Sequence, residues 1–252
     1  MVKLEGVASE QAPIVNILSR LTRSLHKQGI KSTLFKFYML IVDHWFDVRY
    51  GTDTSGMMPL DRLTLRSPKK YGRYQATKIV PLKRLFSHIR PIIPPGSVLV
   101  DFGCGKGRVL MIASGYGFRE VRGVEYAHKL CSVAIDNCNR YKLATKVTTE
   151  FRIIGSDAGE YIINPDENIF FLFNPFGKTI LMKVLKNINK SLEQRPRKAL
   201  LIYNTPRFDD MIVNESTFVR TEELNLLGYH LVVYSNMDHP RTGGVRADAA
   251  QN

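Results

Sequence analysis

Three glycines at alternate positions follow an apolar run in the segment VLVDFGCGKGRVL. Gly103 and Gly105 permit a tight turn and leave the backbone bare, and Gly107 permits close packing of a following helix. Glycine-rich turns of this kind often cradle a phosphate, but the spacing here is GxGxG rather than the GxGxxG of dinucleotide-binding loops. The segment therefore predicts a ligand that approaches the backbone closely, without saying which ligand.

Acidic residues near this turn indicate the charge of the ligand. Asp101 stands two residues before Gly103, where it disfavours a phosphate and suits an ammonium or sulfonium group. Glu125 ends the next apolar run, where a carboxylate can bind both ribose hydroxyls and would repel a 2′-phosphate. Asp157, after a third run, could bind the exocyclic amine of adenine. A cationic nucleoside without a phosphate fits these acids best.

Each acid also has a purely structural interpretation. Asp101 could cap the turn by accepting backbone N–H groups. Glu125 alone would be an ordinary solvated charge at a strand end. Asp157 lies in a loop that also contains Glu160, and acids are common in loops.

A second candidate segment is FLFNPFG. The amide oxygen of Asn174 could accept a hydrogen bond from an amine and so align the lone pair of that amine. Pro175 stiffens the turn, and Phe176 could form an apolar or stacking wall. The alternatives are an Asn-Pro pair that simply ends a strand and a phenylalanine that packs in the core.

The elements that must position these residues alternate between strand and helix from residue 98 onward. Short apolar runs end near residues 102, 125, 154, 174 and 204, with helical segments between them. This alternation predicts an α/β fold, a Rossmann-like, doubly wound, mostly parallel seven-stranded sheet. Residues 217–236 predict a terminal antiparallel hairpin. Residues up to about 50 predict an N-terminal amphipathic helix, in which 32–46 would dock on the core. The alternative for 32–46 is a helix that lies in a membrane interface.

The motifs VDFGCGKGRVL, GVEYA, GSDA and FNPFG, in this order, resemble those of class I S-adenosylmethionine-dependent methyltransferases. The resemblance covers about residues 74–236 and implies S-adenosyl-L-methionine as the cofactor. It implies that the methionine part is bordered by Asp101, Gly103 and Gly105. It also implies that Glu125 holds the ribose, that Asp157 with Ala158 holds the adenine, and that Asn174 lies beside the methyl group.

The upstream segments YGTDTSG and YGRYQAT, taken with FLFNPFG, are similar to a bacterial group of class I methyltransferases without assigned substrates. That group often has a proline in place of Ala76. In related enzymes this region closes over the cofactor, so Tyr74 and Gln75 become candidate lid residues. The alternative is a segment leading into a helix that Thr77 caps. Lys106 and Arg108 are expected to face solvent or to support the helix.

The acceptor is inferred from FNPFG, which is similar to the (N/D)PP(Y/F) motif of amino-methylating nucleic-acid enzymes. It is also similar to an Asn-and-Phe motif of non-SET histone-lysine methyltransferases. Both resemblances imply an amine nitrogen, on a protein or a nucleic acid, with a small molecule as a third choice. Two rival functions remain: a nicotinamide-dependent oxidoreductase, and a non-catalytic nucleotide-binding module on the same fold.

Composition adds an uneven distribution of charge to this picture. Residues 1–95 carry 16 basic and 6 acidic residues, against 20 and 17 in the remainder. This predicts a basic helical N-terminal extension (1–73), a methyltransferase domain (74–240) and a flexible tail (241–252). The extension suggests an anionic partner, either nucleic acid or acidic lipid. Three unpaired cysteines, no metal-ligand spacing and no apolar run long enough to span a bilayer predict a cytoplasmic protein without a metal.

Overall fold

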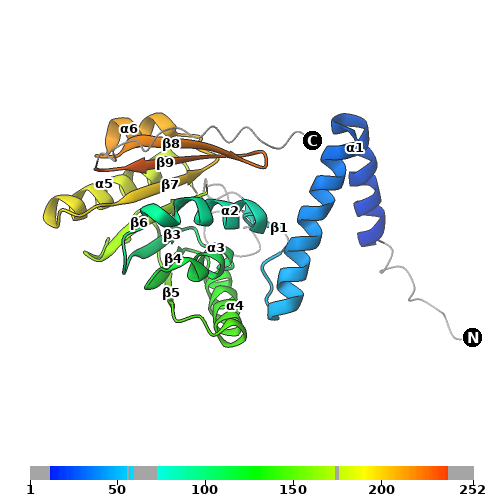
Figure 1. Ribbon diagram of the computed structural model, residues 1–252, viewed down its shortest axis with the longest axis horizontal. Helices are drawn as coiled ribbons and strands as arrows, with labels where there is room; N and C mark the ends of the chain where they lie inside the picture. Colours follow the sequence, from blue (N-terminus) through cyan, green and yellow to red (C-terminus); the bar gives the residue numbers. More distant parts are fainter. Residues whose placement is uncertain (1–11, 56, 60–72, 174–175, 238–252) are drawn as a thin grey trace, which may run out of the picture.

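The computed structural model describes residues 12–55, 57–59, 73–173 and 176–237, and it is built around one seven-stranded sheet (Figure 1). The strands that form this sheet are β3 (Val98–Phe102), β4 (Glu120–Glu125), β5 (Glu150–Gly155), β6 (Glu167–Leu172), β7 (Leu200–Asn204), β8 (Val219–Leu226) and β9 (Tyr229–Ser235). Their order across the sheet is β5-β4-β3-β6-β7-β9-β8. Only β9 runs against the others, pairing antiparallel with both β7 and β8.

This topology confirms the predicted fold class, including the antiparallel hairpin at the end. It also fixes where a ligand would bind. From β3 the chain passes outward through β4 and β5 and then returns to place β6 on the other side of β3. The strand order therefore reverses between β3 and β6. In open sheets of this kind, ligands bind outside the carboxyl ends of the strands at such a reversal.

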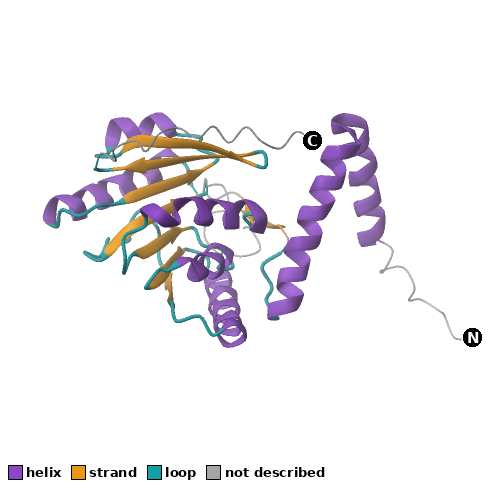
Figure 2. Cartoon of the chain, in the orientation of Figure 1, coloured by secondary structure: helices purple, strands orange, loops and turns teal. Residues whose placement is uncertain are grey.

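Helices cover both faces of the sheet (Figure 2). The helices are α1 (Ala12–Tyr50), α2 (Ile79–Ile89), α3 (Arg108–Ala113), α4 (His128–Thr145), α5 (Lys178–Gln194) and α6 (Asp209–Glu215). Two short 3-10 turns, η2 (Arg90–Ile92) and η3 (Ser114–Tyr116), follow α2 and α3. Side chains of α2, α3 and α4 form one core cluster, and those of α5 and α6 form the other.

The central strands are apolar on both sides because both of their faces are covered. In β3, Leu99 packs in the first cluster, whereas Val100 and Phe102 pack in the second. Alternate residues of a strand point to opposite faces, so a strand buried between two helical layers must be apolar throughout. This explains why the apolar runs could be recognised in the sequence as core strands.

The N-terminal helix is as long as predicted, ending at Tyr50, but only one of its faces is docked. Met39 and Phe46 are buried, and the Phe46 ring stacks on Tyr141 of α4 with 5.7 Å between ring centroids. The expectation that residues 32–46 dock on the core therefore holds for one face alone. No helix among the described residues is long and apolar enough to cross a membrane.

The predicted cap of α2 is wrong. Thr77 makes no side-chain cap, and Lys78 occupies the N-cap position. Instead the carboxylate of Asp43, on α1, accepts a hydrogen bond from the backbone N–H of Ile79 at 3.3 Å. A carboxylate stabilises the first turn of a helix through its free N–H groups and its dipole. The cap therefore comes from a residue distant in the sequence.

Two further elements were not predicted. The strands β1 (Met57–Pro59) and β2 (Arg73–Gln75) pair antiparallel in a small separate sheet, which places Tyr74 and Gln75 in a strand. The short helix α6 follows β7 and packs Ile212 against the second cluster. Neither element is long enough to give a periodic pattern in the sequence.

Candidate functional site

The glycine-rich turn leaves β3 at its carboxyl end and makes three left-handed steps. Gly103, Gly105 and Gly107 have φ angles of 80°, 55° and 82°, a region that side chains disfavour. The N–H of Gly103 donates to the carbonyl oxygen of Val124 at 2.8 Å. A Cβ on Gly107 would lie 3.1 Å from the sulfur of Cys138, on α4. The predicted roles in turning and close helix packing are thus confirmed.

Glu125 lies at the end of β4, beside this turn. Its Oε2 accepts a hydrogen bond from the N–H of Gly105 at 3.0 Å, and its Oε1 accepts one from the N–H of Ala127 at 2.9 Å. The side chain is buried, so it is not the solvated strand-end charge that the sequence left open. Burial raises its pKa, partly offset by these N–H groups.

The hydrogen bond from Gly105 changes what the turn can bind. In a phosphate-binding loop the bare N–H groups point at the anion. Here the N–H at the tip of the turn already donates to a carboxylate. The site therefore presents negative charge where a phosphate loop would present positive dipoles, in agreement with the ligand charge inferred from the sequence.

Asp101 lies within β3, opposite Gly123 of β4, and its side chain is 3% exposed. Among the residues that the structure describes, no donor forms a hydrogen bond to its carboxyl group and no cation pairs with it. Burial and the neighbouring charge of Glu125 raise its pKa well above the usual value. The alternative that Asp101 caps the turn needs a backbone N–H that donates to its carboxyl group, and no described residue provides one.

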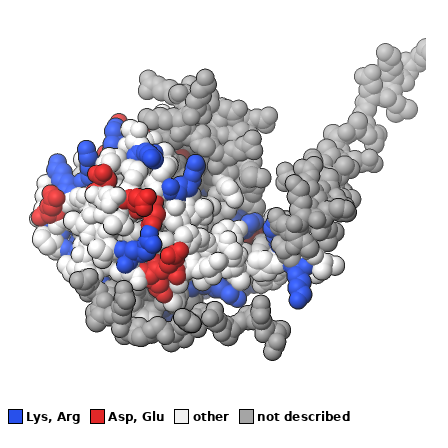
Figure 3. All heavy atoms as spheres, turned by 90° about the horizontal axis from the view of Figure 1, so that it is seen from above, with Lys and Arg blue, Asp and Glu red and all other residues white. Residues whose placement is uncertain are grey.

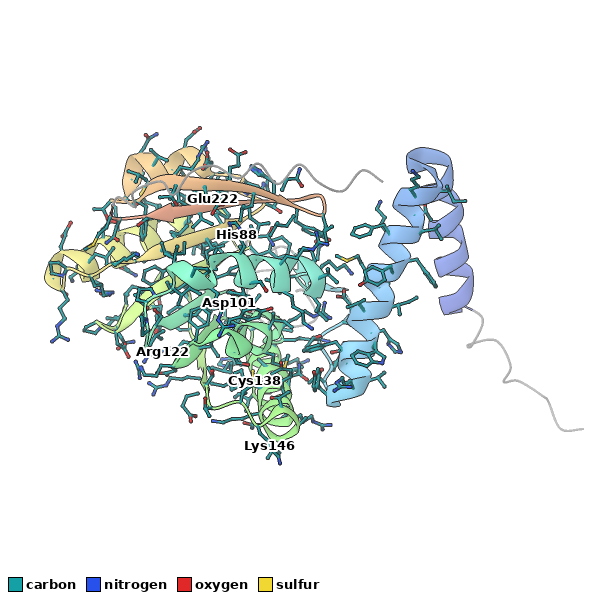
Figure 4. The ribbon with its side chains drawn as sticks, viewed as in Figure 1. His88, Asp101, Arg122, Cys138, Lys146 and Glu222 are labelled. Carbon is teal, nitrogen blue, oxygen red and sulfur yellow. The ribbon has the colours of Figure 1, made fainter. Side chains whose placement is uncertain are left out.

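An uncompensated buried carboxylate destabilises a protein unless something binds it. Asp101 and Glu125 together form such a centre at the end of two adjacent strands (Figure 4 labels Asp101). A cation bound there would restore the charged form of Asp101. The residues present fit the ammonium or sulfonium of a cationic nucleoside, and they do not fit a phosphate.

Asp157 and Ala158 follow β5, the strand next to β4. One carboxylate oxygen of Asp157 accepts the N–H of Gly159 at 2.8 Å, so this acid shapes its own turn. Ala158 packs on the second core cluster. The three acids of the predicted site thus lie at or next to the carboxyl ends of three neighbouring strands, β3, β4 and β5. An adenine contact by Asp157 stays a prediction.

The candidate acceptor segment follows β6, across the reversal from β3. Asn174 and Pro175 lie outside the described residues, so their predicted roles stay predictions. Phe176 is half-buried and packs against the second core cluster, as its structural alternative required. Of the candidate lid residues, Tyr74 is placed through the backbone of β2, and Gln75 is exposed.

The structure corrects the interpretation of Lys106 and Arg108, two residues of the glycine-rich segment. Both side chains are buried, so neither faces solvent. The ammonium group of Lys106 lies 2.9 Å from both carboxylate oxygens of Asp53. The guanidinium of Arg108 donates to the hydroxyls of Thr54 and Ser55 at 2.8 and 3.0 Å. These two cations therefore fasten residues 53–55 onto the glycine-rich turn.

Asp47, at the end of α1, holds the same segment from the other side. Its carboxylate accepts hydrogen bonds from the hydroxyls of Thr52 and Thr54 at 2.8 and 2.7 Å, and from the N–H of Ser55 at 2.9 Å. Burial opposes its ionised form, but the hydrogen bonds from Ser55, Thr54 and Thr52 prevail and lower its pKa. The signal in the sequence was the group of hydroxyl side chains around the single acid Asp53 in YGTDTSG.

No family model matches the chain, and no curated protein matches it in sequence. Solved structures do match its fold. The Escherichia coli protein yhhF, an inferred methyltransferase, superposes with a TM-score of 0.50 at 17% identity, covering 66% of this chain and 90% of its own. The chain has a class I methyltransferase-like fold. An RNA methyltransferase from Salinibacter ruber in complex with S-adenosyl-L-homocysteine matches at 17% identity and a TM-score of 0.45, over 65% and 95% of the two chains.

Within this methyltransferase-like fold, the acids occupy the edge where the strand order reverses. The superposition covers about two thirds of this chain. Residues 74–236, over which the sequence motifs extend, make up a similar share of it. The N-terminal helix α1 and the segment after it contact Lys78, Arg108 and Lys106 through Asp43, Asp47 and Asp53.

Proposed function

We propose that this chain is an S-adenosylmethionine-dependent methyltransferase that transfers a methyl group to an amine nitrogen. The observation that carries the proposal is Asp101, a buried carboxylate next to Glu125 at the reversal of the sheet, with no described partner. A cationic nucleoside supplies what this centre lacks, and the fold is compatible with that ligand.

Each residue of the site has a separate task in this proposal. Asp101 pairs with the positive charge of the methionine part, and the bare backbone at Gly103 and Gly105 lets that part approach. Glu125 keeps lone-pair capacity for the ribose, since a carboxylate accepts about four hydrogen bonds. The backbone N–H groups of Gly105, Tyr126 and Ala127 leave part of that capacity open. Asp157 and Ala158 border the adenine. When bound, the cofactor supplies an electrophilic methyl group on a sulfonium.

The acceptor residues are proposed from the segment after β6. Asn174 accepts a hydrogen bond from the attacking amine and directs its lone pair toward the methyl group, and Pro175 restricts the turn. Phe176 closes the site with an apolar wall. Methyl transfer is an in-line displacement, so alignment of this kind is the main requirement. The acceptor amine belongs to a protein or to a nucleic-acid base.

Two observations disfavour the nicotinamide-dependent alternative. The tip N–H of the turn donates to Glu125, which leaves no pyrophosphate cradle there. The sheet also differs from the dinucleotide-binding order 3-2-1-4-5-6, because the antiparallel β9 lies between β7 and β8.

Calorimetric titration tests the cofactor. We expect S-adenosylmethionine and S-adenosylhomocysteine to bind and NAD not to bind. Glu125→Ala should weaken both nucleosides about 10- to 100-fold, because it removes a charged hydrogen-bond partner. Glu160→Ala, at an exposed acid of the neighbouring loop, serves as the matched control and should leave affinity unchanged. Failure of both nucleosides to bind would refute the proposal, and so would equal effects of the two variants.

Tritiated methyl transfer into fractionated lysate tests the acceptor. Label that protease removes indicates a protein amine, whereas label that nuclease removes indicates a nucleic-acid base. Asn174→Ala should lower transfer about 100-fold while leaving cofactor affinity near the wild-type value. Equal loss of transfer and binding would contradict the role proposed for Asn174. Label found only in small molecules would contradict the proposed acceptor class but not the proposed methyl transfer.

A further inference from the structure

The helix α1 carries large apolar side chains that nothing in the described structure covers. These side chains are between 43% and 66% exposed, and they belong to Ile30, Leu34, Phe37, Tyr38, Leu40, Ile41, Trp45 and Val48. Six of them follow one another at steps of three or four residues, from Ile30 to Val48. That spacing places them along one face of a helix. We call these six, Ile30, Leu34, Phe37, Ile41, Trp45 and Val48, the apolar stripe.

The apolar stripe lies opposite the face that docks on the rest of the molecule. The docked face contains Met39, Asp43, Phe46 and Asp47, all of them buried. Figure 1 shows the second part of α1 standing at the side of the sheet, with the first part of the helix folded back beside it on the side away from the sheet. The second part is thus held by one face, while the apolar stripe stays between 43% and 66% exposed. A contiguous apolar surface on a protein usually marks an interaction site.

The charges of α1 indicate what this surface binds. The helix sequence contains six Lys or Arg residues and only two acids, Asp43 and Asp47. Both acids are buried, and both lie within 4 Å of the guanidinium of Arg108. Lys31, Lys36 and Arg49 are exposed. The outward surface of the described part of the helix thus combines apolar side chains with positive charge and shows no acid.

The sheet region has a different surface. Basic and acidic side chains are mixed over the face of it that Figure 3 shows. The excess of basic residues is concentrated in residues 1–95. Within that region, α1 contains six basic and two acidic residues, and residues 51–95 contain nine basic and two acidic ones. What distinguishes α1 is the combination of exposed cations with a stripe of exposed apolar residues.

We propose that the apolar stripe of α1 lies in the surface of an anionic lipid bilayer. An amphipathic helix with Trp, Phe and Leu on one face and Lys or Arg beside it binds at the level of the headgroups. The guanidinium of Arg49 lies 5.0 Å from the ring centroid of Trp45, which places a cation and an amphipathic aromatic side by side. The long basic side chains extend from the apolar face toward phosphate.

Two other partners fit this surface less well. A nucleic acid would meet the positive charge, but aliphatic side chains such as Ile30, Leu34 and Val48 give it neither stacking nor hydrogen bonds. A second copy of this helix would bring exposed cations against cations, with no exposed acid on the described part of α1 to pair with them. An anionic bilayer satisfies both the apolar stripe and the charge.

Trp45 provides a direct test, because it is the single tryptophan of the chain and is 57% exposed. The full-length protein is mixed with vesicles of phosphatidylcholine, alone or with phosphatidylglycerol. We expect the Trp45 emission to shift to the blue and to be quenched by brominated lipid, only when phosphatidylglycerol is present. Sedimentation of the protein with the vesicles gives the partition coefficient.

Three variants separate the contributions. The double variant Phe37→Ser and Ile41→Ser, which keeps Trp45, should lower partitioning at least about tenfold. Leu143→Ser with Ile162→Ser, at apolar residues 80% and 82% exposed elsewhere, is the matched control and should leave it unchanged. Lys31→Gln with Arg49→Gln should lower it about 25-fold, since each basic residue contributes about fivefold. Circular dichroism checks that every variant is folded.

The competing outcomes are distinguishable from this result. A blue shift that follows protein concentration without lipid, with a dimer in sedimentation velocity, would overturn the proposal in favour of self-association. A response of Trp45 to RNA but not to vesicles would overturn it in favour of a nucleic-acid partner. Equal losses in the stripe variant and its control would show that the stripe is not the binding surface. None of these measurements depends on the proposed enzymatic activity.

Discussion

The same sheet has a cluster of buried acids at each of its two ends, and the two clusters differ in how their charge is balanced. At the amino end, Glu120 and Glu167 begin β4 and β6 and surround the guanidinium of Arg122 at 2.7 and 2.6 Å (Figure 4 labels Arg122). At the carboxyl end, Asp101 and Glu125 meet no described cation.

The pKa directions reflect this difference. The hydrogen bond from Arg122 lowers the pKa of Glu120, whereas burial and the charge of Glu125 raise the pKa of Asp101. A protein that needed only stability could pair both clusters. The paired cluster joins strands, and we infer that the unpaired one is kept for a ligand.

The largest effect is expected from removing Arg122, the cation that balances the buried acids at the amino end of the sheet. Arg122→Met leaves Glu167, which is fully buried, without its cation, and it leaves Glu120 with only the exposed Arg152 and Arg119. We expect a loss of about 3 to 5 kcal/mol in the free energy of unfolding, as for other broken buried pairs. Urea titration measures it. Arg119→Gln, at an exposed arginine that also contacts Asp166, should cost less than about 1 kcal/mol. If both variants lowered the free energy of unfolding by similar amounts, the buried ion pairs at the amino end would not differ from exposed ones, and the contrast between the two clusters would fail.

A smaller effect is expected from Gly123, which faces Asp101 across the β3–β4 pair. A Cβ there would lie 2.5 Å from the sulfur of Cys104 and 2.8 Å from Cδ1 of Leu110. Gly123→Ala should therefore destabilise the chain by about 1 to 3 kcal/mol and displace the glycine-rich turn. Gly115→Ala, with open space around it, is the control for thermal unfolding. A harmless Gly123→Ala would mean that the turn is not tightly packed.

The smallest effect concerns Asp47, whose carboxylate accepts hydrogen bonds from hydroxyls and N–H groups and lies 3.8 Å from the guanidinium of Arg108. Asp47→Asn should lower the free energy of unfolding by about 1 to 2 kcal/mol at pH 7. The folded pKa of Asp47 is lowered, so its contribution is present above the unfolded value of 3.8 and is lost as pH falls below it. The cost of the variant should accordingly begin to fall below the unfolded value of 3.8 and disappear below the lowered folded pKa. Asp136→Asn, at an exposed acid, should show no such dependence. A cost that persisted in acid would contradict this origin.

Local patterns in the sequence were enough to predict the sheet. Contacts between residues that are distant in the sequence could not be predicted from these patterns. The apolar runs such as Val98–Phe102 are buried on both faces, so their composition alone identified them as core strands. The turn and Glu125 could be placed because a strand end and its following loop are close in sequence. These parts obey rules that operate within a few residues.

Other features depend on residues that are distant in the chain. Lys106 looked like a solvent-exposed residue because its partner, Asp53, lies 53 positions earlier. The N-terminus of α2 is bound by Asp43 rather than by the adjacent Thr77, and local capping rules cannot reveal this. The exposed stripe of α1 likewise could not be told from a buried one by periodicity, since either face of that helix contains apolar residues.

The central claim is that Asp101 is an uncompensated carboxylate kept for a cationic ligand. Its raised folded pKa means that the folded chain binds this proton more tightly than the unfolded chain. The unliganded protein should therefore lose stability as pH rises above about 4 toward that folded pKa. Asp101→Asn removes both the buried charge and the partner of the ligand, so it should affect stability and binding in opposite directions.

Thermal unfolding of the wild type and Asp101→Asn, with and without S-adenosylmethionine, tests this directly. We predict that the variant raises the unliganded Tm by about 2 to 4 °C at pH 8, less at pH 5, and loses the increase in Tm that S-adenosylmethionine gives the wild type. A variant with a lower unliganded Tm and an undiminished response to S-adenosylmethionine would contradict the account.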